Sequence, residues 1–270
     1  IKLVTSIAGL VEGKITQDTT MRVTRNGRMS LTEALARSNN PYFSILGKDL
    51  GFEKVAYYSR MMGIGEKAGL DITGEKAGYF PEQEPASSQG GLGLLSYCGT
   101  GIAMTPLQLS ALVSMIANDG TMNWLQYPRT QAEVDAFQPK VKRQMDLQKD
   151  VEHLLPVEWG SGQRARKNAE SDEQIYGKTG TCTNVVDRKT HLGWFGAFNK
   201  VGDRRLSVVV LLTGGRPVNG PVASGIAGAV YRILNGQNYY ANSSSTSLPL
   251  PELSTNLEYP PPPDSQDEQE

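Results

Sequence analysis

A cation, two hydroxyl groups and a bare backbone position follow one another at residues 178–181 (KTGT). Together with Gly177 this run is similar to the end of a phosphate-binding P-loop. That motif requires another glycine five residues before Gly177, and Asp172 stands there. Phosphate binding is therefore excluded, and another chemistry must account for polar residues in a stretch that begins as an apolar strand.

Two further polar pieces lie earlier in the chain. Ser38-Asn39-Asn40 forms a polar corner before a proline, and Lys2 lies near the start of an apolar helical pattern. Each piece also has a purely structural explanation. Ser38-Asn39-Asn40 can be a turn in which asparagine tolerates a left-handed backbone, and Lys2 can be a solvated charge. KTGT can protect the edge of a strand against pairing with another chain. Taken in chain order, however, the three match the set Ser-x-x-Lys, Ser-x-Asn and Lys-Thr-Gly of serine acyl-transfer enzymes.

With these motifs the chain resembles the penicillin-binding transpeptidases, the serine acyltransferases that cross-link peptidoglycan. The resemblance covers about residues 1–235. It includes three longer segments: 35–75 (LARSNN…DITGE), 99–120 (GTGIAMTPLQLSALVSMIANDG), and GKTGTCTN followed by GWFGAF. The chain contains no complete Ser-x-x-Lys. If Lys2 is the lysine of that motif, we expect the nucleophilic serine two positions before Ile1, and the first strands of the sheet also upstream.

The resemblance implies a role for each matching residue in acyl transfer from a peptide ending in D-Ala-D-Ala. Lys2 is expected to be the base that activates the serine, which requires a lowered pKa. Ser38 would pass a proton to the leaving amine, and Asn40 would hold the lysine and a substrate amide. Lys178 would lower the pKa of Lys2 and attract the terminal carboxylate.

The resemblance assigns the substrate-binding wall to the strand that carries KTGT. The hydroxyls of Thr179 and Thr181 would bind the carboxylate, and Gly180 would let the peptide backbone lie close as an added strand. The N–H of Thr181 would form half of an oxyanion hole, a donor typically worth about 3–4 kcal/mol of the barrier.

The surrounding elements predict a mixed α/β fold. Helices are expected at 1–13, 31–38, 41–50, 53–62 and 106–117, with a capping box at Ser30/Glu33 for the second and a Thr105 cap followed by Pro106 for the last. Residues 63–101 read as connecting loops, and one helix is expected around 147–159. Strands follow at 175–183, 191–198 and 205–213, the last two as a hairpin.

A final helix at 220–234 places Val222, Ile226, Ala229, Val230 and Ile233 on one face, with Gly225 and Gly228 allowing close approach to a sheet. Helices before strands predict an antiparallel sheet flanked by helices. The resemblance implies the three-layer β-lactamase/transpeptidase-like fold with an all-helical subdomain and its N-terminal strands missing.

Composition and charge exclude several other classes of function. The net charge is −1, and because six acidic residues and no Lys or Arg follow Arg232, residues 1–232 carry +5. That bias is too small and too dispersed for nucleic-acid binding. No apolar run is long enough to span a membrane. His153 and His191 lack partners at metal-ligand spacing, so we expect neither a metal nor a cofactor.

The remaining expectations concern cysteines and domains. Cys98 and Cys182 do not indicate a redox compartment, and Cys182 reads as small strand filler. Residues 1–235 are expected to form the transpeptidase domain and 236–270 a disordered Ser/Pro-rich acidic tail.

We therefore expect a D,D-transpeptidase whose partners are peptidoglycan stem peptides, β-lactams and other cell-wall synthesis proteins. The resemblance also implies an extracytoplasmic position with a membrane anchor upstream. Three alternatives share some of these features: a D,D-carboxypeptidase or serine β-lactamase, a catalytically inactive fragment or degenerate relative, and a protein-binding module that rests only on the Pro-rich tail.

Overall fold

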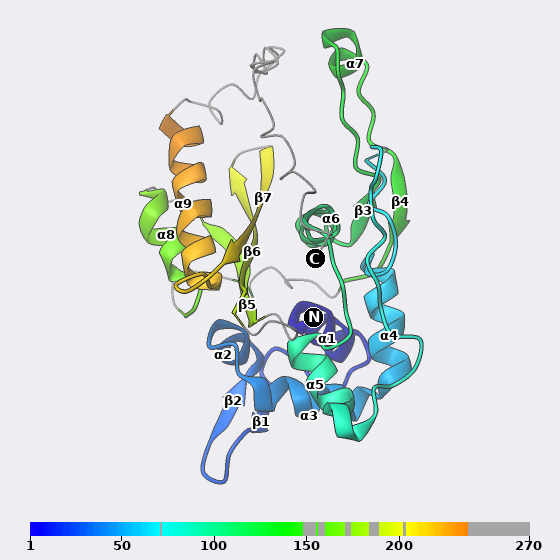
Figure 1. Ribbon diagram of the computed structural model, residues 1–270, viewed down its shortest axis with the longest axis vertical. Helices are drawn as coiled ribbons and strands as arrows, with labels where there is room; N and C mark the ends of the chain where they lie inside the picture. Colours follow the sequence, from blue (N-terminus) through cyan, green and yellow to red (C-terminus); the bar gives the residue numbers. More distant parts are fainter. Residues whose placement is uncertain are drawn as a thin grey trace, which may run out of the picture.

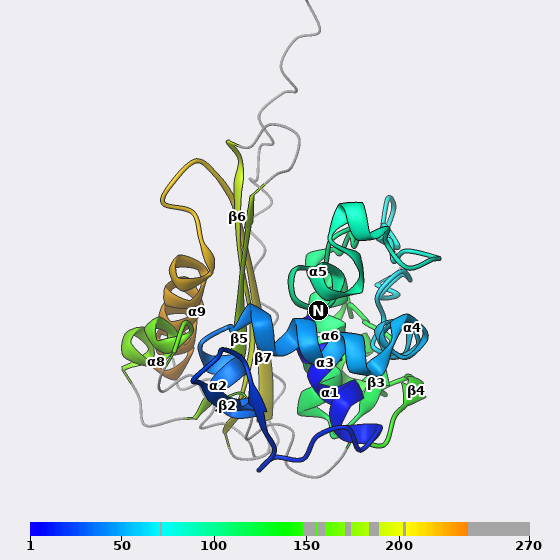
Figure 2. The ribbon, with the colours of Figure 1, turned by 90° about the horizontal axis from the view of Figure 1, so that it is seen from below.

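The protein is arranged in three layers around a small antiparallel sheet (Figures 1 and 2). The computed structural model describes residues 1–70, 72–147, 155, 160–170, 174–183, 189–201 and 204–236. Two helices cover one face of the sheet, and a larger group of helices lies on the other side (Figure 2). The expected mixed α/β fold, with an antiparallel sheet flanked by helices, is confirmed.

The central sheet consists of β5 (Ile175–Thr183), β6 (His191–Val201) and β7 (Arg204–Gly214), in that order. Both pairings are antiparallel, and Lys178 lies opposite Gly196. The three predicted strands and the hairpin are therefore confirmed. Because β6 occupies the middle position, β5 has an edge that no other strand of this sheet covers.

One face of the sheet packs against α8 (Gln163–Ala169) and α9 (Gly220–Gly236). Its core contains Phe195 and small residues of α9 such as Ala223 and Ala227. The predicted apolar face of α9 was wrong, because Ile226 is 42% and Ile233 55% exposed.

The two glycines of α9 also serve a different contact from the predicted one. A Cβ at Gly228 would collide with the Ala165 carbonyl, and one at Gly225 would lie 3.1 Å from Asn168 Nδ2. These glycines therefore bring α9 close to α8 rather than to the sheet.

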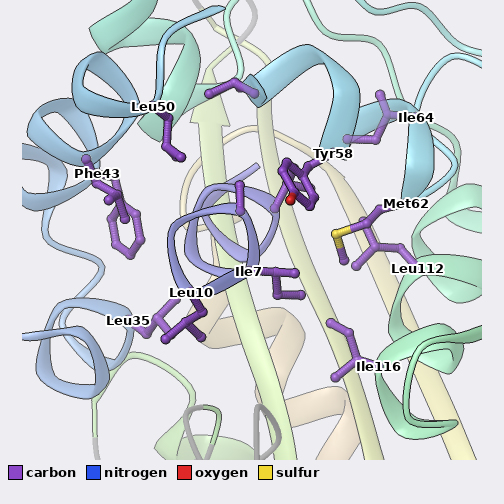
Figure 3. Close-up of a cluster of buried hydrophobic side chains, with 14 of the residues drawn as sticks. Ile7, Leu10, Leu35, Phe43, Leu50, Tyr58, Met62, Ile64, Leu112 and Ile116 are labelled. Carbon is purple, nitrogen blue, oxygen red and sulfur yellow. The ribbon is translucent and has the colours of Figure 1, made fainter. Parts of the chain in front are cut away.

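The helical group on the other side shares a second core centred on α1 (Lys2–Val11). Figure 3 shows Ile7 of α1 among side chains from several helices. The surrounding helices are α2 (Leu31–Ala36), α3 (Asn40–Leu50), α4 (Phe52–Met61) and α6 (Pro106–Ala117). On the sheet, a Cβ at Gly196 would lie 2.9 Å from Val113 Cγ2, so this glycine allows α6 to pack closely.

Residues 63–101 match the prediction of connecting loops up to residue 86 and differ from it after that. They contain the short helix η1 (Ser87–Gln89) and the helix α5 (Gly91–Cys98). Gly93 of α5 and Gly47 of α3 allow these two helices to cross closely: a Cβ at Gly93 would lie 2.5 Å from Ser44 Oγ, and one at Gly47 would collide with Ser96. The other nine glycines of residues 63–101 have positive φ, as turns and helix ends require, whereas Gly93 serves helix packing, which the sequence pattern does not reveal.

The remaining elements are peripheral. Two-stranded sheets form between β1 (Thr20–Arg22) and β2 (Arg28–Ser30) and between β3 (Thr121–Asn123) and β4 (Val141–Gln144), with α7 (Gln131–Asp135) between the latter two. Both predicted caps are present: Ser30 and Glu33 form the capping box of α2, and Thr105 caps α6, where Gln108 completes a second box. Of the helix expected around 147–159 only Leu147 and Leu155 are described, and the tail beyond Gly236 lies outside the described residues. Among the described helices, none combines the length and the apolar character needed to cross a membrane.

Candidate active site

The Ser38 corner is a helix end with an unusual backbone. α2 ends at Ala36, and Ser38 adopts φ +53, a left-handed conformation that a residue with a Cβ adopts at an energetic penalty. The next residue, Asn39, caps α3 by accepting a hydrogen bond from the Tyr42 N–H at 2.9 Å. The two helix ends thereby fix the position of the Ser38 hydroxyl and of Asn40, the first residue of α3.

Lys2 reaches this corner from the first turn of α1. Its Nζ donates to Ser38 Oγ at 2.8 Å, to the Ser38 carbonyl at 2.9 Å and to Asn40 Oδ1 at 2.7 Å. Nζ also lies 5.7 Å from the ring centroid of Phe43. Three oxygen acceptors therefore hold the amine, and the expected proximity of Lys2, Ser38 and Asn40 is observed.

Lys178 approaches the same hydroxyl from the sheet. Side chains alternate along a strand, so Lys178 lies on the same face of β5 as Tyr176, which packs in the core of the helical group. Its Nζ donates to Ser38 Oγ at 3.2 Å and to the Thr179 carbonyl at 2.9 Å. The Ser38 hydroxyl thus accepts from both amines and links three elements that are distant in the sequence.

Burial changes the protonation of both amines. Burial first, and then the neighbouring charge of Lys2, lowers the pKa of Lys178 from 10.5 to about 7. Burial lowers the pKa of Lys2 from 10.5 to about 8, against an opposing contribution from Cys98. The lower pKa belongs to Lys178, opposite to the order expected for a Lys2 base beside a Lys178 cation, and burial rather than Lys178 accounts for the lowered pKa of Lys2. Near neutral pH the pair can nevertheless hold one neutral and one charged amine.

The free edge of β5 presents backbone donors next to this pair. The Gly177 N–H points away from β6, since it donates to the Leu155 carbonyl at 2.8 Å. Because backbone groups alternate in direction along a strand, the N–H groups of Thr179 and Thr181 point to the same free edge. The exposed Thr181 also accepts the Gly220 N–H on its Oγ1 at 2.9 Å.

Gly180, the other residue assigned to substrate binding, lies directly opposite Trp194 of β6. A Cβ there would lie 3.3 Å from Trp194 Cβ. The glycine is half-buried, between the two threonines of the edge.

Ser161 is a residue of the site that the sequence did not indicate. Its hydroxyl lies 2.5 Å from Thr179 Oγ1, directly beside the lysine motif. It belongs to the polar stretch 121–170, where the sequence carries no recognisable motif. Neither its type nor its spacing distinguishes it from an ordinary loop serine.

The two cysteines differ in environment. Cys98 is exposed at the end of α5, whereas Cys182 is half-buried on the face of β5 that carries Lys178. Burial raises the pKa of the Cys182 thiol.

Comparison with known families decides the classification. The model of the penicillin-binding protein transpeptidase domain matches residues 1–232. The chain belongs to this transpeptidase family. The match includes both lysines and the Ser38 corner.

Individual relatives of this family are similar over different lengths. Stage V sporulation protein D of Bacillus subtilis is 30% identical over 227 residues, which are 77% of this chain and 34% of that protein. Peptidoglycan D,D-transpeptidase MrdA of Acinetobacter baumannii is 29% identical over 105 residues, which are 36% of this chain and 16% of that protein. The chain thus spans about a third or less of the length of these two relatives.

Solved structures share the fold. A chain of a peptidoglycan synthase complex superposes with a TM-score of 0.69 and 23% identity, covering 92% of this chain and 46% of that one. PBP2 of Pseudomonas aeruginosa gives a TM-score of 0.69 and 21% identity, covering 86% of this chain and 57% of that one. The three-layer arrangement is therefore that of the transpeptidase family.

Proposed function

We propose that this chain is the acyl-transfer part of a peptidoglycan D,D-transpeptidase, which forms a serine acyl-enzyme with stem peptides and is acylated by β-lactams. The proposal rests on one observation: two lysine amines donate to the same hydroxyl. Lys2 Nζ lies 2.8 Å and Lys178 Nζ 3.2 Å from Ser38 Oγ. Two amines with lowered pKa values around one hydroxyl are suited to moving a proton between a nucleophile and a leaving group.

In the first step, the serine three positions before Lys2 in the family motif attacks the carbonyl of the penultimate D-alanine. Lys2, in the fraction of molecules in which its amine is neutral, takes the serine proton while the carbonyl oxygen becomes an oxyanion; its lowered pKa of about 8 increases this fraction near neutral pH. A substrate carboxylate at Lys178 raises the pKa of Lys178 and so keeps that amine charged. The Thr181 N–H on the free edge of β5 donates to that oxyanion, and the N–H of the serine itself supplies the second donor.

In the second step, the bond to the terminal D-alanine breaks. The leaving amine receives its proton through the Ser38 hydroxyl, which is replenished from Lys2. The acyl group remains on the serine as an ester. The amine of a second stem peptide then attacks this ester and loses a proton along the same path in reverse, which completes the cross-link.

Substrate recognition in this proposal uses the edge of β5. The stem peptide lies along this edge as an added strand, and its terminal carboxylate meets Lys178 and the hydroxyls of Thr179 and Thr181. Asn40, which accepts from Lys2 at 2.7 Å, keeps its amide N–H groups available for a substrate carbonyl.

The names of the relatives support transpeptidation over hydrolysis, since MrdA of Acinetobacter baumannii is called a peptidoglycan D,D-transpeptidase. The competing assignments, a D,D-carboxypeptidase or a serine β-lactamase, would end the reaction with water in place of an amine. We further propose an extracytoplasmic location, a membrane anchor upstream, cell-wall synthesis proteins as partners, and a domain that ends near residue 235 before the acidic tail.

The test uses the extended polypeptide, meaning this chain joined to the sequence encoded upstream of Ile1. We expect a fluorescent penicillin to label it covalently on the serine three positions before Lys2, with slow release of the drug. Lys2→Ala and Lys178→Ala should each abolish labelling. The absence of labelling in the unsubstituted polypeptide would contradict the proposal, and rapid drug turnover would instead support a β-lactamase.

A further inference from the structure

The loop before α8 connects the two halves of the site. Its Ser161 N–H donates to the Ala36 carbonyl at 3.0 Å, at the end of the helix that leads to Ser38. Gly160 adopts φ +93 and packs so closely on Ala36 that a Cβ there would collide with the Ala36 carbonyl. The position of Ser161 is therefore fixed by the Ser38 corner through the backbone.

The side chain of Ser161 extends from this anchored backbone to β5. Its Oγ lies 2.5 Å from Thr179 Oγ1, and Lys178 Nζ lies 3.4 Å from that same threonine oxygen. Thr179 is 9% exposed, and a Cβ at Gly220 would lie 2.8 Å from Thr179 Cβ, so α9 closes the other side. The Thr179 hydroxyl is thus confined between a serine hydroxyl and an ammonium group.

A threonine hydroxyl has one proton to donate and two lone pairs that accept. Lys178 occupies one lone pair. If Ser161 donates to the second, the Thr179 proton remains free for an external acceptor; if Thr179 donates to Ser161, that proton is used internally. The direction of one hydrogen bond therefore decides whether Thr179 is a donor toward the cleft.

We propose that Ser161 is a positioning residue that donates to Thr179 Oγ1 and so directs the Thr179 proton to the terminal carboxylate of the substrate. This inference rests on the proposed function, because it requires a carboxylate at Thr179. It adds to that function that the enzyme's preference for substrates with a terminal carboxylate depends on Ser161, which lies in the loop before α8 and outside the three sequence motifs.

The proposal differs from a purely structural role in one measurable respect. If the hydrogen bond between Ser161 and Thr179 only held the loop before α8 in place, its removal would slow acylation by all substrates to the same extent. A residue that orients the Thr179 donor affects only substrates with a carboxylate. The ratio of the acylation rate constants for a penicillin and for its uncharged methyl ester separates the two roles.

The experiment measures this ratio in the extended polypeptide and in its Ser161→Ala variant. Since a hydrogen bond to a charged group is stronger than a neutral one, we expect the variant to lower the ratio about tenfold, through slower acylation by the carboxylate form. Ser161→Thr keeps the hydroxyl and should restore most of the ratio. In a Thr179→Val background, Ser161→Ala should change the ratio no further, since residues that act through one another are not additive.

Ser114→Ala is the matched control, because Ser114 Oγ forms a similar hydroxyl pair with Ser207 Oγ at 3.0 Å between α6 and β7. It should leave the ratio unchanged. If Ser161→Ala does not fold, Ser161→Cys, which has a weaker donor of similar shape, takes its place. An unchanged ratio, or equal slowing of both substrates, would overturn the inference while leaving the proposed function intact; no labelling of the unsubstituted polypeptide would overturn both.

Discussion

The backbone of Ser38 gives a prediction that separates stability from function. Ser38 holds φ +53, although residues with a Cβ avoid this region and glycine does not. Its hydroxyl accepts from Lys2 and Lys178. We infer that the serine persists at a strained position because the hydroxyl is needed there, as strained residues often are at functional sites.

The prediction compares Ser38→Gly with Ser38→Ala. Both variants remove the hydroxyl and its two hydrogen bonds, so those losses cancel in the comparison. Only alanine retains the Cβ in the left-handed conformation, which should make it less stable by about 1 kcal/mol. For a domain of this size, that difference corresponds to about 2–4 °C in the melting temperature.

The assay is thermal unfolding of the two variants in the extended polypeptide, accompanied by penicillin labelling. We expect the glycine variant to melt at the higher temperature, and both variants to be labelled far more slowly than the unsubstituted protein. Equal melting temperatures, or greater stability of the alanine variant, would refute the reasoning about strain. Normal labelling of either variant would refute the role of the hydroxyl.

Three further predictions concern pH, a buried amide and the thiols. Because the folded chain loses the Lys178 proton above about pH 7 while the unfolded chain keeps it up to about 10.5, the unfolded state binds more protons in this range and stability should rise with pH. Lys178→Met should flatten that rise in thermal unfolding between pH 7 and 9. Gln108 is 1% exposed and its Nε2 donates to three backbone carbonyls, so Gln108→Met should lower the free energy of unfolding by about 3 kcal/mol in urea titration. Iodoacetamide should alkylate the exposed Cys98 faster than Cys182, whose pKa is raised by burial, as followed by peptide mass spectrometry.

Each of these predictions has an outcome that contradicts it. A stability of the Lys178→Met variant that rises with pH as steeply as in the unsubstituted protein would show that Lys178 is not the group that titrates. A loss below about 1 kcal/mol for Gln108→Met would mean that the three carbonyls find other partners. Faster alkylation of Cys182 would contradict its burial on β5.

Much of the fold could be predicted because the relevant signals are local. Ser30 with Glu33, and Thr105 with Pro106, indicate helix starts from residues close in the sequence, and both caps form. The strands were predicted from runs of apolar and β-branched residues, and the pairing of β6 with β7 from the turn between them. Such patterns involve neighbours in the sequence and need no knowledge of tertiary contacts.

Features that depend on tertiary contacts were missed. The helix α5 was assigned to loops because its glycines are unfavourable for an isolated helix, yet Gly93 is required where α5 crosses α3 near Ser44. The buried face of α9 was misplaced because its small residues pack inward while Ile226 and Ile233 remain exposed. A pattern of apolar residues alone does not reveal that close packing favours small ones.

The motif residues of the site were predicted from the sequence, but their protonation and the role of Ser161 were not. Lys2, Ser38, Asn40 and Lys178 came from motif resemblance, and the structure brings all four together. The lowered pKa values of Lys2 and Lys178 depend on burial, which the sequence does not give. Ser161 reaches Thr179 from a segment without any motif, so only the folded arrangement identifies it.

The most direct test of the central claim is a crystal structure of the extended polypeptide after reaction with a carboxylate-bearing penicillin. The account predicts an ester on the serine three positions before Lys2, with the carbonyl oxygen at the Thr181 N–H and the drug carboxylate at the Thr179 and Thr181 hydroxyls. Lys2 Nζ and Ser38 Oγ should lie within hydrogen-bond distance of the ester or of the former leaving group. An adduct on another residue, or a carboxylate bound away from β5, would contradict the account.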